Sequence, residues 1–391
     1  MNIFVNSLRM YHVKALLLGL ILHVFLAETK ANINGCHSSL LKDCNCGRVY
    51  RDQRTYFVVN CTNTGFQDTS MLEELPEETE WLVFTGNHVP ILDSNVFGED
   101  VVLNNLEIID MTNNGIRDIR GKAFHRVMNV KRLILNHNNI TISENDDENF
   151  HHPRVFSNFY NLEELHLTNA FADNTDSGLA EDLHDIFVNS NLTKLYKLHL
   201  EQNEIKNFKD EFVFCDLPNL HDIYLGNNNI PNVNFNINCM KRLRYIDLEQ
   251  NNITKFTQKD LDAFDRAAQR HEDGLTLDLD GNPFRCDAAV KIFYGWLMKT
   301  KVIIRNKRTL QCQHSRYGTR YILNLTNFAE AKHARVSRAL TILLVVLTIV
   351  LLSLVAAFAY LRKEAMKNKL SPIFDSITRK VHYTHIESQD V

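Results

Sequence analysis

One spacing of apolar residues recurs eight times between Thr79 and Phe284. It has the form apolar-x-x-apolar-x-apolar-x-x-Asn-x-apolar, and its alternating part has a period of two, which predicts a short strand with one buried face. One such strand cannot bury its apolar face alone, so we expect successive copies to stack about 4.8 Å apart as a parallel sheet. The clearest copy consists of Leu243, Ile246, Leu248, Asn251 and Ile253.

The Asn of each copy is expected to turn the chain out of the strand. Its side-chain amide can form hydrogen bonds with buried backbone groups that no neighbouring strand satisfies, so the pattern predicts a ladder of Asn amides. The fourth copy, which begins at Leu162, has Ala170 where the Asn belongs. We therefore predict a local irregularity in the fourth coil.

The distance between copies varies along the chain. The copies begin near residues 79, 106, 130, 162, 195, 220, 243 and 274, so three compact intervals of 23–25 residues occur among longer ones of 27–33 residues. The longer intervals contain the insertions Ser143–Tyr160, Phe171–Asn191 and Asp260–Gly274. Insertions in repeat arrays emerge as loops on one face, which is either a binding face or neutral surface. Apolar residues at helical spacing predict a convex-side helix at Lys259–Arg270.

The eight registered copies resemble the leucine-rich repeat. This resemblance implies an α/β-type repeat solenoid, a horseshoe with a parallel concave sheet and disulfide-capped ends. The sequence around Cys36–Cys61 resembles the cysteine-rich N-terminal cap of extracellular members, and Asn282–Asp287 followed by Trp296 and Cys312 resembles their C-terminal cap. Caps of this kind cover apolar solenoid ends that would otherwise be exposed.

The resemblance also implies how the cysteines of the caps pair. It favours Cys36–Cys46 and Cys44–Cys61 at the N-terminal end, where the four residues alone allow three pairings. The usual C-terminal cap has four cysteines, but Ala288 replaces one of them, so a single bridge between Cys286 and Cys312 is expected.

The remaining two cysteines, Cys215 and Cys239, precede their repeat copies by five and four residues. They occupy nearly the same phase of adjacent coils, and equivalent positions one coil apart are about 5 Å apart, within reach of a disulfide. We therefore predict a Cys215–Cys239 bridge. All eight cysteines precede the long apolar segment near the C-terminus, as expected for an oxidising compartment.

Two apolar segments indicate a single-pass type I plasma-membrane protein with an extracellular N-terminal ectodomain. Ala15–Ala27, with basic residues before it and a small-x-small site at Thr29–Ala31, predicts a secretory signal. Ala339–Leu361 contains no charge, and 23 residues of helix suffice to cross a bilayer. The predicted domains are 1–31 signal peptide, 32–78 N-terminal cap, 79–281 repeats, 282–328 C-terminal cap, 329–338 stalk, 339–361 transmembrane helix and 362–391 cytoplasmic tail.

Short motifs agree with this topology. In the tail, Tyr383 and Ile386 match a tyrosine-based sorting phrase, which would recruit a cytoplasmic sorting adaptor. The tail of about thirty residues is too short for a signalling domain. Five glycosylation sequons precede the apolar helix and none follows it. Their asparagines are Asn60, Asn139, Asn191, Asn252 and Asn324.

The outward-facing strand residues form the predicted ligand-binding surface, the concave face. Its N-terminal third is apolar, whereas its C-terminal half is acidic around two tyrosines, a composition that favours a protein partner with a basic patch. The histidines of the set lie in neighbouring coils; a pH switch, a metal pair and inert surface residues are all conceivable. The predicted binding residues are Trp81, Ile108, Ile134, His166, His199, Asp222, Tyr224, Tyr245, Asp247, Glu249 and Asp278.

The sequence contains no catalytic signature such as Gly-x-Ser-x-Gly or His-Glu-x-x-His, and no Gly-rich phosphate loop. We predict a non-enzymatic protein without cofactor or metal. The formal charge of −4 and pI near 6.5 do not favour nucleic-acid binding. Adhesion or cell–cell recognition is the first hypothesis. An innate immune recognition protein or co-receptor and an auxiliary subunit of a channel or receptor are the alternatives.

Overall fold

The computed structural model describes residues 34–36, 38–100, 102–142, 155–172, 176–270, 272–315 and 318–363. The predicted signal segment 1–31, part of the insertion Ser143–Tyr160, and the sorting residues Tyr383 and Ile386 lie outside the described residues. The chain forms two compact units, Met1–Leu323 and Asn324–Val391.

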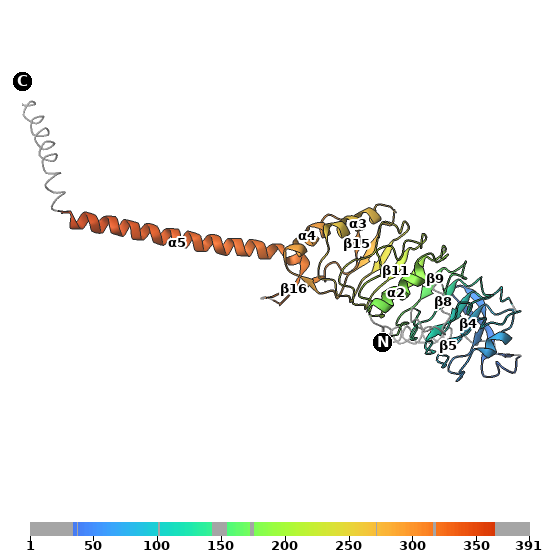
Figure 1. Cartoon of the computed structure of the whole chain (residues 1–391). Helices are drawn as coiled ribbons and strands as arrows, with labels where there is room; N and C mark the ends of the chain where they lie inside the picture. Colours follow the sequence, from blue (N-terminus) through green and yellow to red (C-terminus); the bar gives the residue numbers. More distant parts are fainter. Residues whose placement is uncertain are drawn as a thin grey trace, which may run out of the picture. The chain divides into compact units, whose positions relative to one another are not determined.

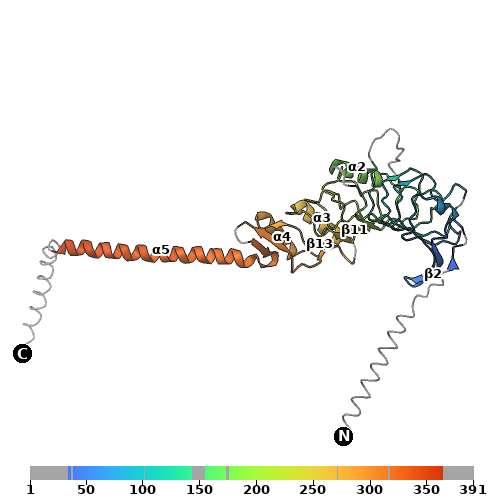
Figure 2. The ribbon, with the colours of Figure 1, turned by 90° about the horizontal axis from the view of Figure 1, so that it is seen from below.

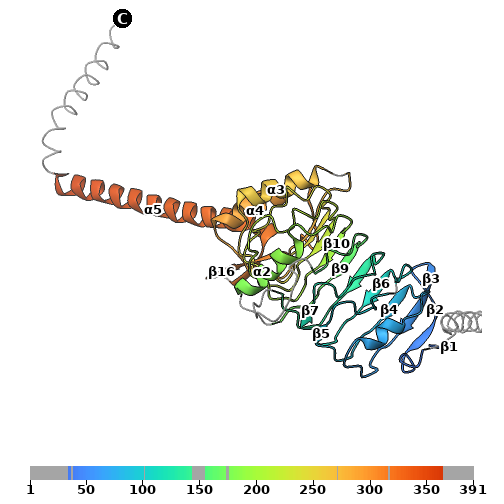
Figure 3. The ribbon, with the colours of Figure 1, turned by 45° about the vertical axis from the view of Figure 1, so that its right-hand side comes forward.

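The first unit is a solenoid built on one 12-stranded sheet. Each repeat contributes one three-residue strand, and consecutive strands pair in parallel register, as the period-two pattern predicts. Figures 1 and 3 show the strands following one another in sequence order between the two caps. These strands are β4 (Trp81–Val83), β6 (Ile108–Asp110), β8 (Arg132–Ile134), β9 (Glu164–His166), β10 (Lys197–His199), β11 (Asp222–Tyr224), β12 (Tyr245–Asp247) and β13 (Thr276–Asp278).

Apolar side chains of the repeats fill the space behind the sheet. The middle residue of each strand, such as Leu165 or Ile246, is fully buried. Phenylalanines fill the interior between the sheet and the outer turns, and Phe208, Phe214 and Phe235 contact one another at centroid distances of 5.1–5.8 Å. Each coil therefore shares its core with its neighbours, as the sequence pattern requires.

The Asn residues form the predicted ladder. Asn228 Nδ2 donates to the Leu200 carbonyl of the preceding coil at 2.9 Å, and Asn228 Oδ1 accepts from the backbone N–H of Asn203 at 3.0 Å. The residue before each ladder position has a left-handed backbone, with φ between 48° and 70° in all eight copies. Equivalent bonds from the ladder amide to the preceding coil are made by Asn87, Asn114, Asn138, Asn203, Asn251 and Asn282.

The predicted irregularity at the fourth coil is wrong for the described residues. Strand β9 pairs in register with both neighbours, and Asn169 adopts the same left-handed turn with φ 48°. The backbone N–H of Ala170 donates to Asn203 Oδ1 at 2.8 Å, while Asn138 Nδ2 donates to the Leu135 carbonyl at 2.8 Å. The neighbouring asparagines thus satisfy the groups around the missing side chain, and the turn keeps its shape.

The described residues of the first unit include the helices α2 (Asp176–Phe187), α3 (Gln258–Ala268) and α4 (Ala288–Leu297). Helix α3 confirms the helix predicted at Lys259–Arg270. The helix begins at Gln258 because the preceding residue, Thr257, forms a reciprocal capping box with Asp260. Smaller elements are β5 (Ile91–Leu92), β7 (Asp118–Ile119) and the short 3₁₀ turns η1 (Ser70–Glu74) and η2 (Ile322–Asn324).

The two ends of the solenoid are capped. At the N-terminal end, β1 (Asn34–Gly35), β2 (Asn45–Arg51) and β3 (Arg54–Asn60) extend the sheet, and β3 pairs in parallel with β4. At the other end, β15 (Ile303–Ile304) is the outermost strand, beside the small sheet of β14 (Phe284–Arg285), β16 (Gln311–His314) and β17 (Gly318–Tyr321). Figure 2 shows β2 and α4 at opposite ends of the solenoid.

Four disulfides join the pairs expected from the sequence. The caps contain Cys36–Cys46, Cys44–Cys61 and Cys286–Cys312, and Cys215–Cys239 links two adjacent coils. The Cα atoms of Cys215 and Cys239 lie 5.3 Å apart, as the equal phase of the two coils predicts.

Replacing both Cys215 and Cys239 by Ser is expected to lower the free energy of unfolding by about 3 kcal/mol, because their bridge closes a loop with a sequence separation of 24 residues. Urea unfolding of the variant, compared with wild type under oxidising conditions, measures this loss. A change below about 0.5 kcal/mol would show that neighbouring coils hold this region without the bridge.

The second unit is dominated by one helix, α5 (Thr326–Leu361), which includes the predicted stalk 329–338. Its segment Ala339–Leu361 has a mean hydropathy of 3.1 and exposes its large apolar side chains, so it is not the buried helix of a soluble core. This confirms a candidate membrane-spanning helix at the predicted position.

Candidate functional site

The outward side chains of the sheet form three columns along the concave face, because parallel register aligns equivalent residues. The middle column changes character along the solenoid: Ile134, His166, His199, Tyr224, Asp247 and Asp278 follow one another on successive strands. Two residues further along each coil, a third column includes Thr168, Glu201, Gly226, Glu249 and Asp280. The C-terminal half of the face therefore concentrates carboxylates.

Aromatic rings stack in the middle column. The rings of His166 and His199 lie 4.2 Å apart and nearly parallel, and His199 and Tyr224 lie 4.1 Å apart. Tyr245, on the next strand but in the column that contains Asp222, packs diagonally against Tyr224 with its ring tilted by 55° at a centroid distance of 5.1 Å. Because the rings cover one another's faces, they offer mainly edges and polar atoms to a ligand. This is a rigid polar surface rather than a platform for stacking a flat ligand.

Glu164 is the centre of a neutralised network in the middle of the face. Its carboxylate accepts hydrogen bonds from Arg132 Nε at 2.9 Å, Tyr196 Oη at 2.7 Å and His166 Nε2 at 3.2 Å. Burial opposes ionisation of this group, but these donors outweigh it and hold the pKa of the Glu164 carboxyl well below its usual range. The charge of this part of the surface is therefore compensated within the protein.

The carboxylates of Asp247, Glu249 and Asp278 form a different kind of cluster, which we call the acidic site. One carboxylate oxygen of each lies within 4.8 Å of the others. Among the described residues, the cation that contacts the site is Arg305, whose Nη1 lies 3.3 Å from Asp278 Oδ2 and 2.9 Å from the Tyr245 hydroxyl. Such a spacing can be bridged by a metal ion or by a cationic side chain.

Gly226 shapes the acidic site. A Cβ atom added there would lie 2.9 Å from Asp247 Oδ2 and 3.1 Å from Glu249 Cγ, so these side chains lean into the space that glycine leaves open. On the other side of Gly226, Glu201 accepts from His199 Nδ1 and Thr168 Oγ1, each at 2.8 Å. A larger residue at position 226 would displace the two carboxylates.

The environment of Asp247 opposes its ionisation. Burial, followed by the neighbouring charges of Glu249, Asp278 and Glu201, raises the pKa of Asp247 to about 7. The same kinds of effect raise the pKa of Glu249. A buried carboxyl that is destabilised as an anion is a frequent mark of a functional site.

Replacing Asp247 by Asn is expected to stabilise the protein at pH 8. Because the pKa is raised on folding, the native state binds the proton more tightly than the unfolded state. Stability therefore falls as the pH rises from about 4 to about 7. Asn is neutral and can keep the bond from the Glu249 N–H. The expected gain at pH 8 is at least about 1 kcal/mol, with a ceiling near 4 kcal/mol.

Thermal unfolding of wild type and D247N across pH 4–8 measures this gain, which should shrink towards pH 4. A constant difference between the two proteins at all pH values would show that the ionisation of Asp247 is not its cause.

The structure corrects several predicted exposures. Ile108, Asp222, Asp247 and Asp278 do lie on the concave face, but each is buried, with exposed fractions of 6%, 7%, 7% and 2%. Short side chains in a sheet with closely spaced strands are covered by longer neighbours; Asp222 lies beneath the guanidinium of Arg244 at 3.0 Å. Half-buried side chains are found at Trp81, Ile134, His166, His199, Tyr224, Tyr245 and Glu249.

The apolar N-terminal residues do not join the acidic site. Trp81 lies near the N-terminal end of the sheet, with Arg51 over its ring at 5.6 Å and Tyr56 packed edge-on at 5.9 Å. Sequence reasoning missed Arg305, and it placed Gly226 and Glu201 on the concave face without selecting them as site residues. Arg305 lies beyond the last repeat, where no register to the strands could be assigned from the pattern. Glu201 and Gly226 lie two residues after the ends of β10 and β11.

Predicted glycosylation sites lie mainly outside the concave strands. Asn139, Asn191, Asn252 and Asn324 are exposed in turns or in η2. Asn60, on β3, is half-buried, and its Oδ1 accepts from Thr62 Oγ1 at 2.6 Å. Sugars at these positions remain a prediction.

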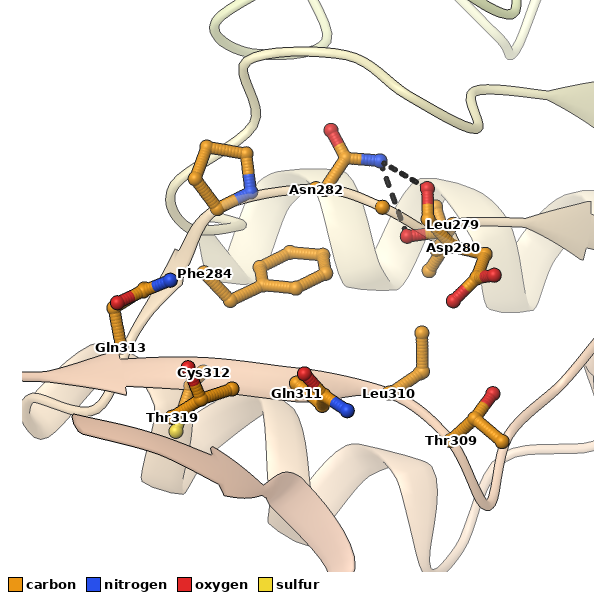
Figure 4. Close-up of a pocket in the computed structure, with 12 residues that line it drawn as sticks. Leu279, Asp280, Asn282, Phe284, Thr309, Leu310, Gln311, Cys312, Gln313 and Thr319 are labelled. Atoms are coloured by element: carbon orange, nitrogen blue, oxygen red, sulfur yellow. Dashed lines mark hydrogen bonds between the residues drawn. The ribbon is translucent and has the colours of Figure 1, made fainter.

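A cleft of about 400 Å³ lies between the turn Leu279–Phe284 and strand β16. Figure 4 shows that the Asn282 amide donates to main-chain oxygens of its own turn, so this group serves the ladder rather than a ligand. Gln311 and Gln313 are exposed, whereas Phe284 is buried at the back of the cleft. The cleft does not contain a charged cluster comparable to the acidic site.

These features define the class of the protein: a leucine-rich-repeat solenoid with disulfide-bonded ends and a candidate membrane-spanning helix. Comparison with known proteins agrees. The leucine rich repeat family matches residues 193–253. Human 5T4 (Wnt-activated inhibitory factor 1, trophoblast glycoprotein) is structurally similar, with a TM-score of 0.57 and 21% identity, covering 68% of this chain and 91% of that chain.

A second solved structure, the TLR13–ssRNA13 complex, matches with a TM-score of 0.41 and 18% identity, covering 66% of this chain and 41% of that chain. No curated protein matches the sequence. The family match and the similarity to human 5T4 therefore show the fold. The function has to be inferred from the chemistry of the concave face.

Proposed function

We propose that this chain is a single-pass type I cell-surface protein whose concave face binds another protein in adhesion or cell recognition. The observation that carries this proposal is the acidic site. Its three carboxylates lie within 4.8 Å of one another. Burial and the neighbouring negative charges oppose the ionisation of Asp247. A basic group of a partner would relieve this repulsion.

The surroundings of the acidic site suit a protein partner. Tyr224 and Tyr245 flank the carboxylates and keep part of their side chains exposed, which is typical of residues that anchor protein interfaces. The Glu164 network next to them is neutralised internally, so attraction to a basic partner comes from the C-terminal half of the face. The partner is therefore expected to place one or two cationic side chains there.

The proposed orientation has separate support. All five sequons and all eight cysteines precede the candidate membrane helix Ala339–Leu361. Disulfides and N-linked sugars form outside the cytosol. We therefore place the solenoid outside the cell and residues 362–391 inside.

The test is a cell-mixing assay with the full-length chain on otherwise non-adherent cells. Wild-type cells should cluster, either with one another or with a labelled partner population. Reversal of the acidic site in D247K/E249K should abolish clustering. The matched reversal E77K/E78K changes two exposed glutamates outside the concave strands and should leave clustering unchanged.

Equal clustering by D247K/E249K and wild type, with equal surface amounts, would contradict the proposed site. Absence of clustering by wild type with any population would contradict adhesion and favour a partner in the same membrane.

A further inference from the structure

The C-terminal cap carries a concentration of positive charge that the acidic site does not explain. Residues 285–320 contain nine Lys or Arg residues and a single acidic residue, Asp287, although the whole chain has a net charge of −4. A charge of this density on one small module marks a site for a polyanion rather than an evenly solvated surface.

Several of these cations are exposed and have no partner. Arg285 faces Asp287 at 3.9 Å, and Arg305 contacts Asp278. By contrast, within the described part of the chain, no ion pair or side-chain hydrogen bond is made by Lys291, Lys299, Lys301 or Arg308. These four side chains are therefore available to a ligand.

The fold arranges the free cations along an edge. Lys301 precedes β15, where exposed residues alternate with the buried Val302 and Ile304. Strand β15 is the outermost strand of the 12-stranded sheet, and residues two apart on an extended chain are separated by about 7 Å. Lys299 lies just before Lys301, and a left-handed turn at Asn306 leads to Arg308. We call Lys299, Lys301 and Arg308 the basic row.

We propose that the basic row binds a linear sulfated polysaccharide. Sulfate groups repeated along a polymer match several unpaired cations placed before and after one edge strand, Lys299 and Arg308 in the flanking turns and Lys301 next to β15. Each contact releases counterions from the polymer. The proposal relies on the orientation given above, because sulfated polysaccharides are the polyanions found outside cells. It concerns a surface other than the acidic site.

An anionic membrane fits the surface less well. A helix that inserts into lipid headgroups presents an apolar face beside its basic residues. Ile292 and Met298 are exposed at α4 and its C-terminal end, but most of the apolar surface of the helix, formed by Val290, Phe293, Trp296 and Leu297, is buried in the cap. A second copy of this chain, docking its acidic site on the basic row, is the other occupant that the test must separate.

The test is salt elution of the full-length protein, in neutral detergent, from immobilised heparin. The variant K299Q/K301Q/R308Q removes the basic row. The control K42Q/R48Q/K122Q removes the same charge from exposed positions in the N-terminal half. The basic-row variant should bind heparin at least about tenfold more weakly. The slope of its log affinity against log salt concentration should fall by the amount expected for the loss of about two to three cationic contacts. The control should elute with wild type.

Equal elution of the two triple variants would overturn the proposal. So would competition by unsulfated hyaluronan as strong as that by heparin, or tighter binding to phosphatidylserine vesicles than to heparin. If K299Q/K301Q/R308Q lost self-association in analytical ultracentrifugation but kept heparin binding, the basic row would be assigned to a second copy of the chain instead. D247K/E249K should keep heparin binding, so this proposal and the proposed function can fail independently.

Discussion

Replacing Glu164 by Ala is expected to lower the free energy of unfolding by about 3–5 kcal/mol, the largest effect of any single substitution considered. The variant leaves the Arg132 guanidinium and the Tyr196 hydroxyl without the carboxylate that accepts their hydrogen bonds at 2.9 and 2.7 Å. Glu164 itself is 6% exposed, so water cannot readily take its place.

Chemical unfolding measures this loss. Glu163→Ala is the matched control, because it removes the same side chain one residue earlier, where the carboxylate makes no hydrogen bond or ion pair with the described residues. It should change stability by about 0.5 kcal/mol or less. Similar losses for the two variants would contradict a special role for Glu164.

Lowering the pH should cause part of the loss of stability that is expected for E164A. The pKa of Glu164 is lowered on folding, so the unfolded state binds the proton more tightly, and the stabilisation is complete above the ordinary pKa near 4.5. It is lost as the pH falls below that value. The stability of wild type should therefore drop in this range more steeply than that of E164A.

Replacing Asn203 by Ala is expected to lower the free energy of unfolding by about 2–3 kcal/mol. Asn203 Nδ2 donates to the Leu167 carbonyl at 2.7 Å, and its Oδ1 accepts from the Ala170 N–H at 2.8 Å. Both groups belong to the coil that lacks its own ladder Asn, so no second amide can replace the lost one.

Urea unfolding checks this prediction against Asn129→Ala. The Asn129 amide makes a similar bond to the Asn104 carbonyl, at 2.9 Å, but at the exposed surface, where water can substitute for it. The control should lose no more than about 0.5 kcal/mol. If N203A unfolds like N129A, the ladder does not stabilise the fourth coil.

The repeat pattern was sufficient to predict the sheet, its parallel register and the bridge Cys215–Cys239, because all three follow from placing each copy directly above the last. The pattern did not predict how the fourth coil tolerates Ala170. That depends on Asn138 and Asn203 in the flanking coils, which the local sequence does not reveal.

The candidate site could be predicted only in outline. Alternation identifies which residues face outward, so Asp247, Glu249 and Asp278 were placed on one surface. It does not show which charges are neutralised. Asp222 is paired with Arg244 and Glu164 with Arg132, and both partners come from other strands or turns. The distinction between compensated and uncompensated carboxylates is a property of the folded structure.

We infer that the charge of Asp247 serves binding although it destabilises the fold. The most direct test is the cell-mixing assay with D247N at pH 7.5, because Asn keeps the size of the side chain and removes its charge. We predict that D247N cells cluster much less than wild-type cells while the variant protein unfolds at a higher temperature. Clustering of D247N cells equal to that of wild type would contradict the claim.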